Sequence, residues 1–83
     1  MSMSWIVKDN KLHKKFVFDS FKQAFEFMTN IAAMAEELNH HPDWCNYYNQ
    51  VIIDLFTHSQ GKITEKDYQL AKRIDAVFDK KVS

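Results

Sequence analysis

The feature that most constrains the fold of this chain is a change of hydrophobic period at Ser20. From this residue to Leu38, apolar side chains recur at spacings of three and four, which predicts an amphipathic helix. Ser20 and Gln23 have the spacing of a capping box, so the helix has a defined start. Pro42 follows closely and predicts the helix end, because a proline disfavours helical angles at the residue before it.

The predicted helix carries more apolar surface than one sheet face can cover. Its apolar side chains fall into two stripes: the first holds Phe21, Ala24, Phe25, Met28, Ile31, Ala32, Ala35 and Leu38, and the second holds Phe27, Ile31, Met34 and Leu38. We expect the first stripe to cover the sheet and the second to face outward. Because an outward apolar stripe is unfavourable in water, and a small core gains stability from association, we predict a homodimer or homotetramer.

Strands are predicted on both sides of this helix. Residues 5–8 and 15–18 precede it, and residues 44–48 and 51–57 follow it, each pair being joined by a turn-prone connection. The second connection, Asn49-Gln50, is short enough for a hairpin turn. Alternation within the last strand puts Val51, Ile53, Leu55 and Thr57 on one face and Ile52, Asp54, Phe56 and His58 on the other.

A second helix completes the pattern. Thr64 stands three residues ahead of Asp67, which suits a helix N-cap, and apolar residues continue at helical spacing from Tyr68 to Phe78. We expect one domain over residues 1–83, because two separate cores in so short a chain would bury too little apolar surface. The order β-β-α-β-β-α predicts an α+β fold, a four-stranded antiparallel sheet with helices packed on one face.

Charge and cysteine content exclude several functional classes. Eleven basic and eleven acidic residues give a formal net charge of zero, without a long run of either sign, so no direct nucleic-acid binding is expected. The single cysteine, Cys45, excludes an internal disulfide and fits a reducing compartment. No segment approaches the roughly 20 apolar residues of a membrane span, and the N-terminus lacks signal-peptide features. We therefore expect a soluble, unprocessed, cytoplasmic protein without membrane contact.

Three of the four histidines gather where predicted elements meet. His40 and His41 lie between the first helix and the next strand, and His58 ends a strand. Loops on a rigid scaffold often hold catalytic groups, and an imidazole can donate or accept a proton near neutral pH. Taken alone, these residues are more often a solvated loop pair and a polar strand end.

A longer pattern surrounds these histidines. It reads Glu36, three residues, His40-His41-Pro42, five residues, Tyr48, nine residues, His58, eight residues and Asp67. This arrangement resembles the signature of the pterin-4a-carbinolamine dehydratase family, also known as the dimerisation cofactor of a liver homeodomain transcription factor. A looser similarity extends from Trp5 through Phe78. Family members commonly carry a further helix before the segment that begins here near Trp5, a departure that affects none of the signature residues.

The resemblance implies a hydro-lyase that converts 4a-hydroxytetrahydrobiopterin to quinonoid dihydropterin in tetrahydrobiopterin recycling, with the pterin as substrate and no cofactor. This dehydration needs a proton delivered to the C4a hydroxyl and a proton removed from N5, which is general acid–base catalysis. By resemblance, His40 and His58 are the catalytic candidates for these transfers, in either order, and His41 is the candidate that orients the pterin. Pro42 has the structural role of fixing this connection, and His13 receives no role.

Four further residues are candidates for binding substrate or supporting the histidines. Glu36 is a candidate for holding a histidine in one tautomer, and its alternative is an ordinary exposed helix residue. Asp67 belongs to the signature, but its capping-box spacing from Thr64 explains an acid there without substrate. Trp44 and Tyr48 are candidates for packing beside the pterin ring, whereas aromatic residues in strands more often pack in the core or on a sheet face.

Two other functions compete with this interpretation. Three histidines with Glu36 form a conceivable zinc site, but adjacent histidines usually point apart and the spacing matches no common helical zinc motif, so no metal is predicted. The other alternative is an oligomeric interaction protein. The resembled family forms dimers and tetramers and also binds a dimeric transcription factor through its helical surface, which would allow a nuclear presence as well.

Overall fold

Two hairpins and two helices alternate along the chain in the predicted order. The computed structural model describes residues 4–82. Its elements are β1 (Ile6–Lys8), β2 (Lys11–Val17), α1 (Phe21–Leu38), β3 (Asp43–Tyr47), β4 (Gln50–Leu55) and α2 (Glu65–Val82). The α+β class and the β-β-α-β-β-α order are therefore confirmed.

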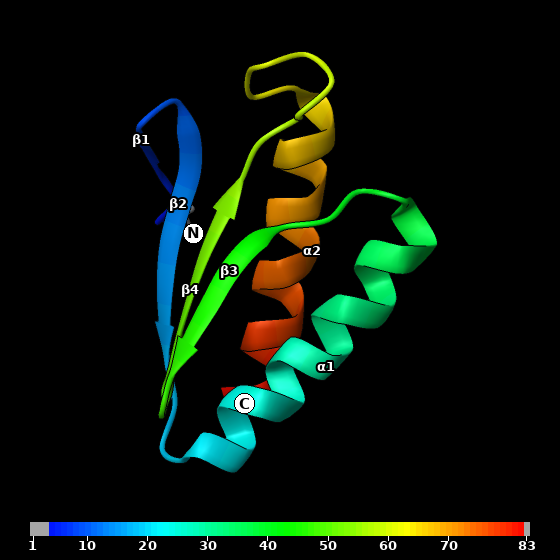
Figure 1. Cartoon of the computed structure of the whole chain (residues 1–83). Helices are drawn as coiled ribbons and strands as arrows, with labels where there is room; N and C mark the ends of the chain where they lie inside the picture. The colour runs from blue at the N-terminus through cyan, green and yellow to red at the C-terminus, as the bar shows by residue number, and fades with distance from the viewer. Residues whose placement is uncertain (1–3, 83) are drawn as a thin grey trace.

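The four strands form one antiparallel sheet in the order β1-β2-β4-β3, so β2 and β4 are central. Both helices lie on the same side of this sheet, and α1 crosses α2 at an angle (Figure 1). The pairing of Phe16 with Val51 and of Leu12 with Leu55 aligns the apolar faces of the two central strands. This face and the two helices enclose the core.

The core is built from the inward faces of these elements. It contains Leu12, Phe16, Phe18, Ala24, Phe27, Ile31, Met34, Val51, Ile53, Leu55, Leu70, Ala71 and Ile74. The Phe27 ring of α1 lies with its centroid 5.0 Å from those of both Phe16 and Phe18. The alternation predicted for the last strand is confirmed, since the four residues predicted to share one face are all buried: Val51, Ile53, Leu55 and Thr57.

The two apolar stripes of α1 are used in the opposite way to the prediction. Phe27 and Ile31 are fully buried, whereas Phe21 and Phe25 remain about half exposed, at 48% and 54%. The physical reason is packing, because the large ring of Phe27 fills the space between the helix and the sheet and meets the rings of Phe16 and Phe18. The small residues Ala24 and Ala35 of the first stripe are buried beside the second stripe, and the large rings of Phe21 and Phe25 face outward.

The connections differ in detail from those predicted. The first turn is Asp9-Asn10, and both residues have positive φ (51° and 66°), which suits a two-residue hairpin turn. β2 consequently begins at Lys11, earlier than predicted. The second turn is Tyr48-Asn49 rather than Asn49-Gln50, because Gln50 already pairs with Tyr47 in the sheet.

The β1 side of the domain is covered by Trp5. Its ring packs edge-on against Phe16, with 5.9 Å between centroids, and its Nε1 donates to the carboxylate of Asp75 at 3.1 Å. Lys14, from the inward face of β2, donates to the same carboxylate at 2.7 Å. These contacts join the segment before β1 to α2, near the sheet edge opposite to β3.

Candidate active site

The α1–β3 connection brings His40 and His41 to one end of the domain. α1 ends at Asn39, whose left-handed conformation (φ 52°) lets its N–H bond the carbonyls of Ala35 and Glu36. The His40 N–H also bonds the Ala35 carbonyl, at 3.1 Å. The chain therefore turns sharply away from the helix and passes the first turns of α2 before entering β3 (Figure 1).

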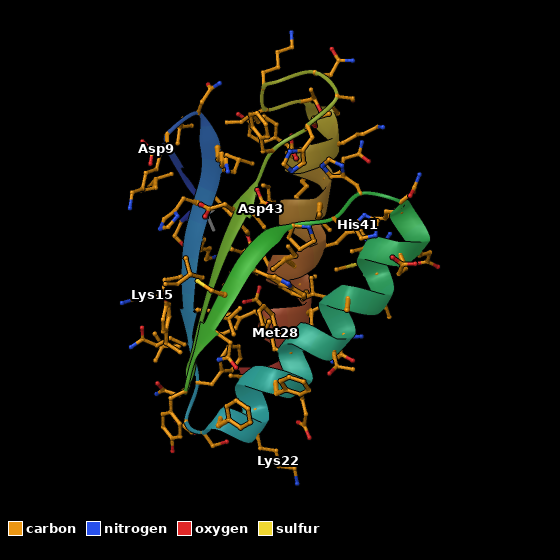
Figure 2. The ribbon with its side chains drawn as sticks, in the orientation of Figure 1. Asp9, Lys15, Lys22, Met28, His41 and Asp43 are labelled. Atoms are coloured by element: carbon orange, nitrogen blue, oxygen red, sulfur yellow. The ribbon has the colours of Figure 1, made fainter. Side chains whose placement is uncertain are left out.

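The three signature histidines line one pocket of about 380 Å³. Its lining residues are Asn39, His40, His41, Pro42, Asp43, Thr57, His58, Ser59 and Lys66. They come from the α1–β3 connection, the first residue of β3, the segment after β4 and the first turn of α2, so segments distant in sequence meet there. Figure 2 shows His41 on the α1 side of this connection and Asp43 on the sheet side.

His40 is held by the buried carboxylate of Asp67. Nε2 of His40 lies 2.6 Å from Oδ1 of Asp67 and donates to it, while Oδ2 accepts from the Thr64 N–H at 2.8 Å and the Thr57 hydroxyl at 2.7 Å. The Thr57 oxygen lies 2.6 Å from that of Thr64, so the Thr64 hydroxyl donates to Thr57. Asp67 is completely buried. It therefore caps α2, as its spacing predicted, and also fixes the orientation of the His40 ring.

His41 forms a more exposed pair with Glu36. Nε2 of His41 lies 2.6 Å from Oε2 of Glu36, and the two side chains are 53% and 79% exposed. An ion pair of this kind contributes little to stability, because water screens it. Glu36 thus contacts a signature histidine across the end of α1, and that histidine is His41 rather than His40.

His58 lies at the open rim of the pocket. Its side chain is 66% exposed, and its ring meets that of Phe56 edge-on, with 5.2 Å between centroids. Nε2 of His58 faces Oδ1 of Asp43 at 3.6 Å. In each of the three signature histidines the nitrogen toward the acid is Nε2, which leaves Nδ1 of each of these rings as the nitrogen available to a ligand.

Two of the predicted aromatic residues do not join this pocket within one chain. Trp44 is partly buried and packs against the hydrophobic core. Tyr48 is 69% exposed and lies in the β3–β4 turn. Because β3 begins beside the histidines and ends at this turn, Tyr48 lies at the opposite end of the hairpin (Figure 1).

Sequence reasoning missed several polar residues of the pocket. Thr57 was predicted to share a strand face with Val51, Ile53 and Leu55, and a hydroxyl on such an apolar face requires a partner, so the pattern contained a signal that Thr57 forms a hydrogen bond. Asp43 and Lys66 carried no comparable signal, because their place in the pocket depends on how separate segments meet. Among the described residues that are not exposed, no buried side-chain nitrogen or oxygen atom lacks a hydrogen-bond partner.

The geometry suits proton transfer to and from a small polar ligand. Imidazole rings with one nitrogen held by a carboxylate present the other nitrogen in a fixed direction. Across residues 4–82, no group of three or more histidine, cysteine, aspartate or glutamate side chains is arranged to hold a metal ion. No helix in that same part of the chain is long and apolar enough to cross a bilayer.

A family model described as pterin 4 alpha carbinolamine dehydratase matches residues 2–77. The chain belongs to the pterin-4-alpha-carbinolamine dehydratase family. A relative in this family from Sulfolobus acidocaldarius is 48% identical over 73 residues, which cover 88% of this chain and 80% of the relative. Another, from Prochlorococcus marinus, is 53% identical over 74 residues, covering 89% and 77% of the two chains.

Two solved structures of the family share this fold. A transcriptional coactivator/pterin dehydratase from Brucella melitensis superposes with a TM-score of 0.85 at 40% identity, covering 88% of this chain and 80% of that one. A pterin dehydratase-like protein described as a RuBisCO assembly factor in the alpha-carboxysome superposes with a TM-score of 0.77 at 30% identity, covering 89% and 88%. The family resemblance found in the signature residues is thus confirmed.

Proposed function

We propose that this protein dehydrates 4a-hydroxytetrahydrobiopterin to quinonoid dihydropterin by histidine acid–base catalysis, in tetrahydrobiopterin recycling. The observation that carries the proposal is the meeting of His40, His41 and His58 in one pocket, with the His40 ring held by the buried Asp67. The pocket volume of about 380 Å³ falls in the range of small-molecule sites, about 300–1,000 Å³. Family membership supports the choice of a pterin as substrate.

In the proposed reaction, one imidazolium donates a proton to the C4a hydroxyl, and the C–O bond breaks to release water. A neutral imidazole removes the N5 proton, and the N5 electron pair forms the new double bond to C4a. One proton is donated and one is removed, so the net protonation of the two imidazoles is unchanged. Loss of water leaves the overall oxidation state unchanged, so no oxidant or reductant is consumed. His40 and His58 are the proposed donor and acceptor, in either order, and His41 is the proposed contact that orients the pterin.

The first prediction concerns the activity itself and its independence of metal. Purified protein mixed with enzymatically generated 4a-hydroxytetrahydrobiopterin should accelerate formation of quinonoid dihydropterin, followed by absorbance. The same rate should persist after exhaustive chelation. Protonation of the leaving hydroxyl by imidazole makes a metal ion acting as a Lewis acid unnecessary. Absence of acceleration contradicts the proposed function, and a rate that is lost with chelator and restored by zinc contradicts the mechanism.

A second candidate function is an interaction role through the outward face of α1. Phe21 and Phe25 are about half exposed, and their ring centroids lie 5.8 Å apart. Leu38 at the end of the same helix is 39% exposed. One structural neighbour is described as a transcriptional coactivator and another as a RuBisCO assembly factor, which supports a surface used for protein association. We propose that this face mediates a homodimer or homotetramer and offers a site for a protein partner.

The second prediction tests that face. Phe25→Glu should weaken self-association, because burying a large apolar side chain contributes roughly 1.5–3 kcal/mol and a buried carboxylate is costly. Light scattering at micromolar concentration measures the assembly, with Asn30→Glu, at an exposed position of the same helix, as the control for one added negative charge. Wild-type protein that scatters as one species near the 9.9 kDa chain mass would rule out self-association.

A further inference from the structure

Asp43 is the one acidic side chain lining the histidine pocket that the family signature does not contain. It directly follows the His40-His41-Pro42 segment and is the first residue of β3. His40 and His41 each have a carboxylate partner at 2.6 Å, in Asp67 and Glu36. The third histidine, His58, faces Asp43 instead.

The Asp43 carboxylate is hydrogen-bonded to Lys11 and faces His58 at a longer distance. Its Oδ2 accepts from Nζ of Lys11 at 3.2 Å, and its Oδ1 lies 3.6 Å from Nε2 of His58. The Lys11 ammonium also lies 5.5 Å from the centroid of the Phe56 ring. The His58 ring packs against Phe56 in a T-shaped arrangement, with 5.2 Å between centroids and 83° between the ring planes. Lys11, Asp43, Phe56 and His58 therefore form a closed set of contacts, which we call the Asp43 cluster.

We propose that Asp43 is a positioning residue for His58. Its carboxylate, anchored on Lys11, attracts the ring toward the orientation in which Nε2 faces Oδ1 at 3.6 Å and Nδ1 is left available to substrate. This inference rests on the proposed function, because it assigns a role within the same pocket. His58 needs a partner that restricts its rotamers, because its side chain is 66% exposed and has few neighbours other than Phe56 and Asp43. A catalytic group that is oriented before substrate arrives avoids that entropy loss during the reaction.

The competing explanation is that Asp43 serves only the Lys11 ion pair at the start of β3. Surface ion pairs of this kind contribute little, and their loss would leave His58 unaffected. Asp54 provides a matched control, since it pairs with Asp43 across β3 and β4 and its carboxylate also faces a histidine. That histidine is His13, 2.6 Å away through Nδ1, and neither residue of this pair lines the histidine pocket.

The experiment measures His58 directly and activity separately, in otherwise intact protein. With ¹³C-labelled imidazole, the order parameter of the His58 ring should fall in Asp43→Asn toward the flexible range, below about 0.6, and recover in part in Asp43→Glu. Asp54→Asn should leave it unchanged. In the dehydratase assay, Asp43→Asn should lower kcat at least about 5-fold, a fraction of the roughly 10²–10⁴ that a positioned acid or base contributes, with little change in KM.

The outcomes distinguish a failure of the proposed role of Asp43 from a failure of the proposed dehydratase function. Unchanged ring order in Asp43→Asn, or an equal loss of kcat in Asp54→Asn, overturns the role of Asp43. If wild-type protein shows no dehydratase activity, the proposed function fails, and the relaxation measurement still decides whether Asp43 orients His58. Thermal unfolding of each variant identifies any that lose activity by unfolding, and Asp43→Glu then provides the folded comparison.

Discussion

Replacing His40 or His58 by alanine should lower the turnover number by roughly 10² to 10⁴, the usual contribution of one positioned acid or base. The two rings reach the same pocket from the α1–β3 connection and from the segment after β4, so each loss removes a different proton-transfer group. The fall should appear in kcat more than in KM, because the proton moves only during the chemical step. Stopped-flow absorbance of the pterin measures it.

Loss of fold is not expected to explain this result. His58 is largely exposed, and in His40→Ala the carboxylate of Asp67 retains its bonds from the Thr64 N–H and the Thr57 hydroxyl. His13→Ala is the matched control, since this histidine also pairs with a carboxylate at 2.6 Å but lies outside the pocket. Near-normal rates in folded His40→Ala and His58→Ala would refute the proton-transfer assignment.

Truncation of Phe27 to alanine should lower the free energy of unfolding by about 3–5 kcal/mol, the usual cost of removing a buried aromatic side chain. Phe27 is fully buried, and its ring contacts those of Phe16, Phe18 and Phe78. Since a domain of this size has only about 5–15 kcal/mol of stability, the variant should be near the limit of folding. Denaturant unfolding followed by circular dichroism measures the change.

Phe25→Ala is the matched comparison on the same helix. At 54% exposure, Phe25 contributes little to the core of the single chain, so its loss should cost less than about 1 kcal/mol at low concentration. Any larger loss should grow with chain concentration, because it would report dissociation of an assembly. A Phe25 variant less stable than the Phe27 variant at every concentration would contradict the orientation of α1.

Local sequence signals predicted most of the fold. The change from period two to period three and four at Ser20, the capping spacing from Ser20 to Gln23, and the turn residues all act between neighbours in the chain. In the structure the Gln23 N–H bonds the Ser20 hydroxyl oxygen at 3.2 Å, as the capping spacing predicts. The Gln23 side chain accepts from the N–H of Asp19 at 3.1 Å, one residue earlier than a standard capping box.

The sequence also determined which residues could form a site, because the signature from Glu36 to Asp67 depends only on residue type and spacing. It could not determine the partner of each residue. Glu36 lies four residues before His40 and five before His41, and the left-handed turn at Asn39 brings it to the more distant of the two, His41. Partners in a hydrogen-bonded site are selected by direction and distance, which spacing along the chain does not encode.

Tertiary structure alone decided the orientation of α1, the place of Tyr48 and the dual role of Asp67. Both stripes of α1 satisfy helical spacing, so the choice depended on which side chains fill the space above β2 and β4. For Asp67, the local spacing correctly predicted a helix cap but did not predict a contact with a histidine. Its contact with His40 arises only because α1, β4 and α2 pack together and leave that carboxylate buried, where it accepts from His40 of the α1–β3 connection and from Thr57 and Thr64 of the β4–α2 connection.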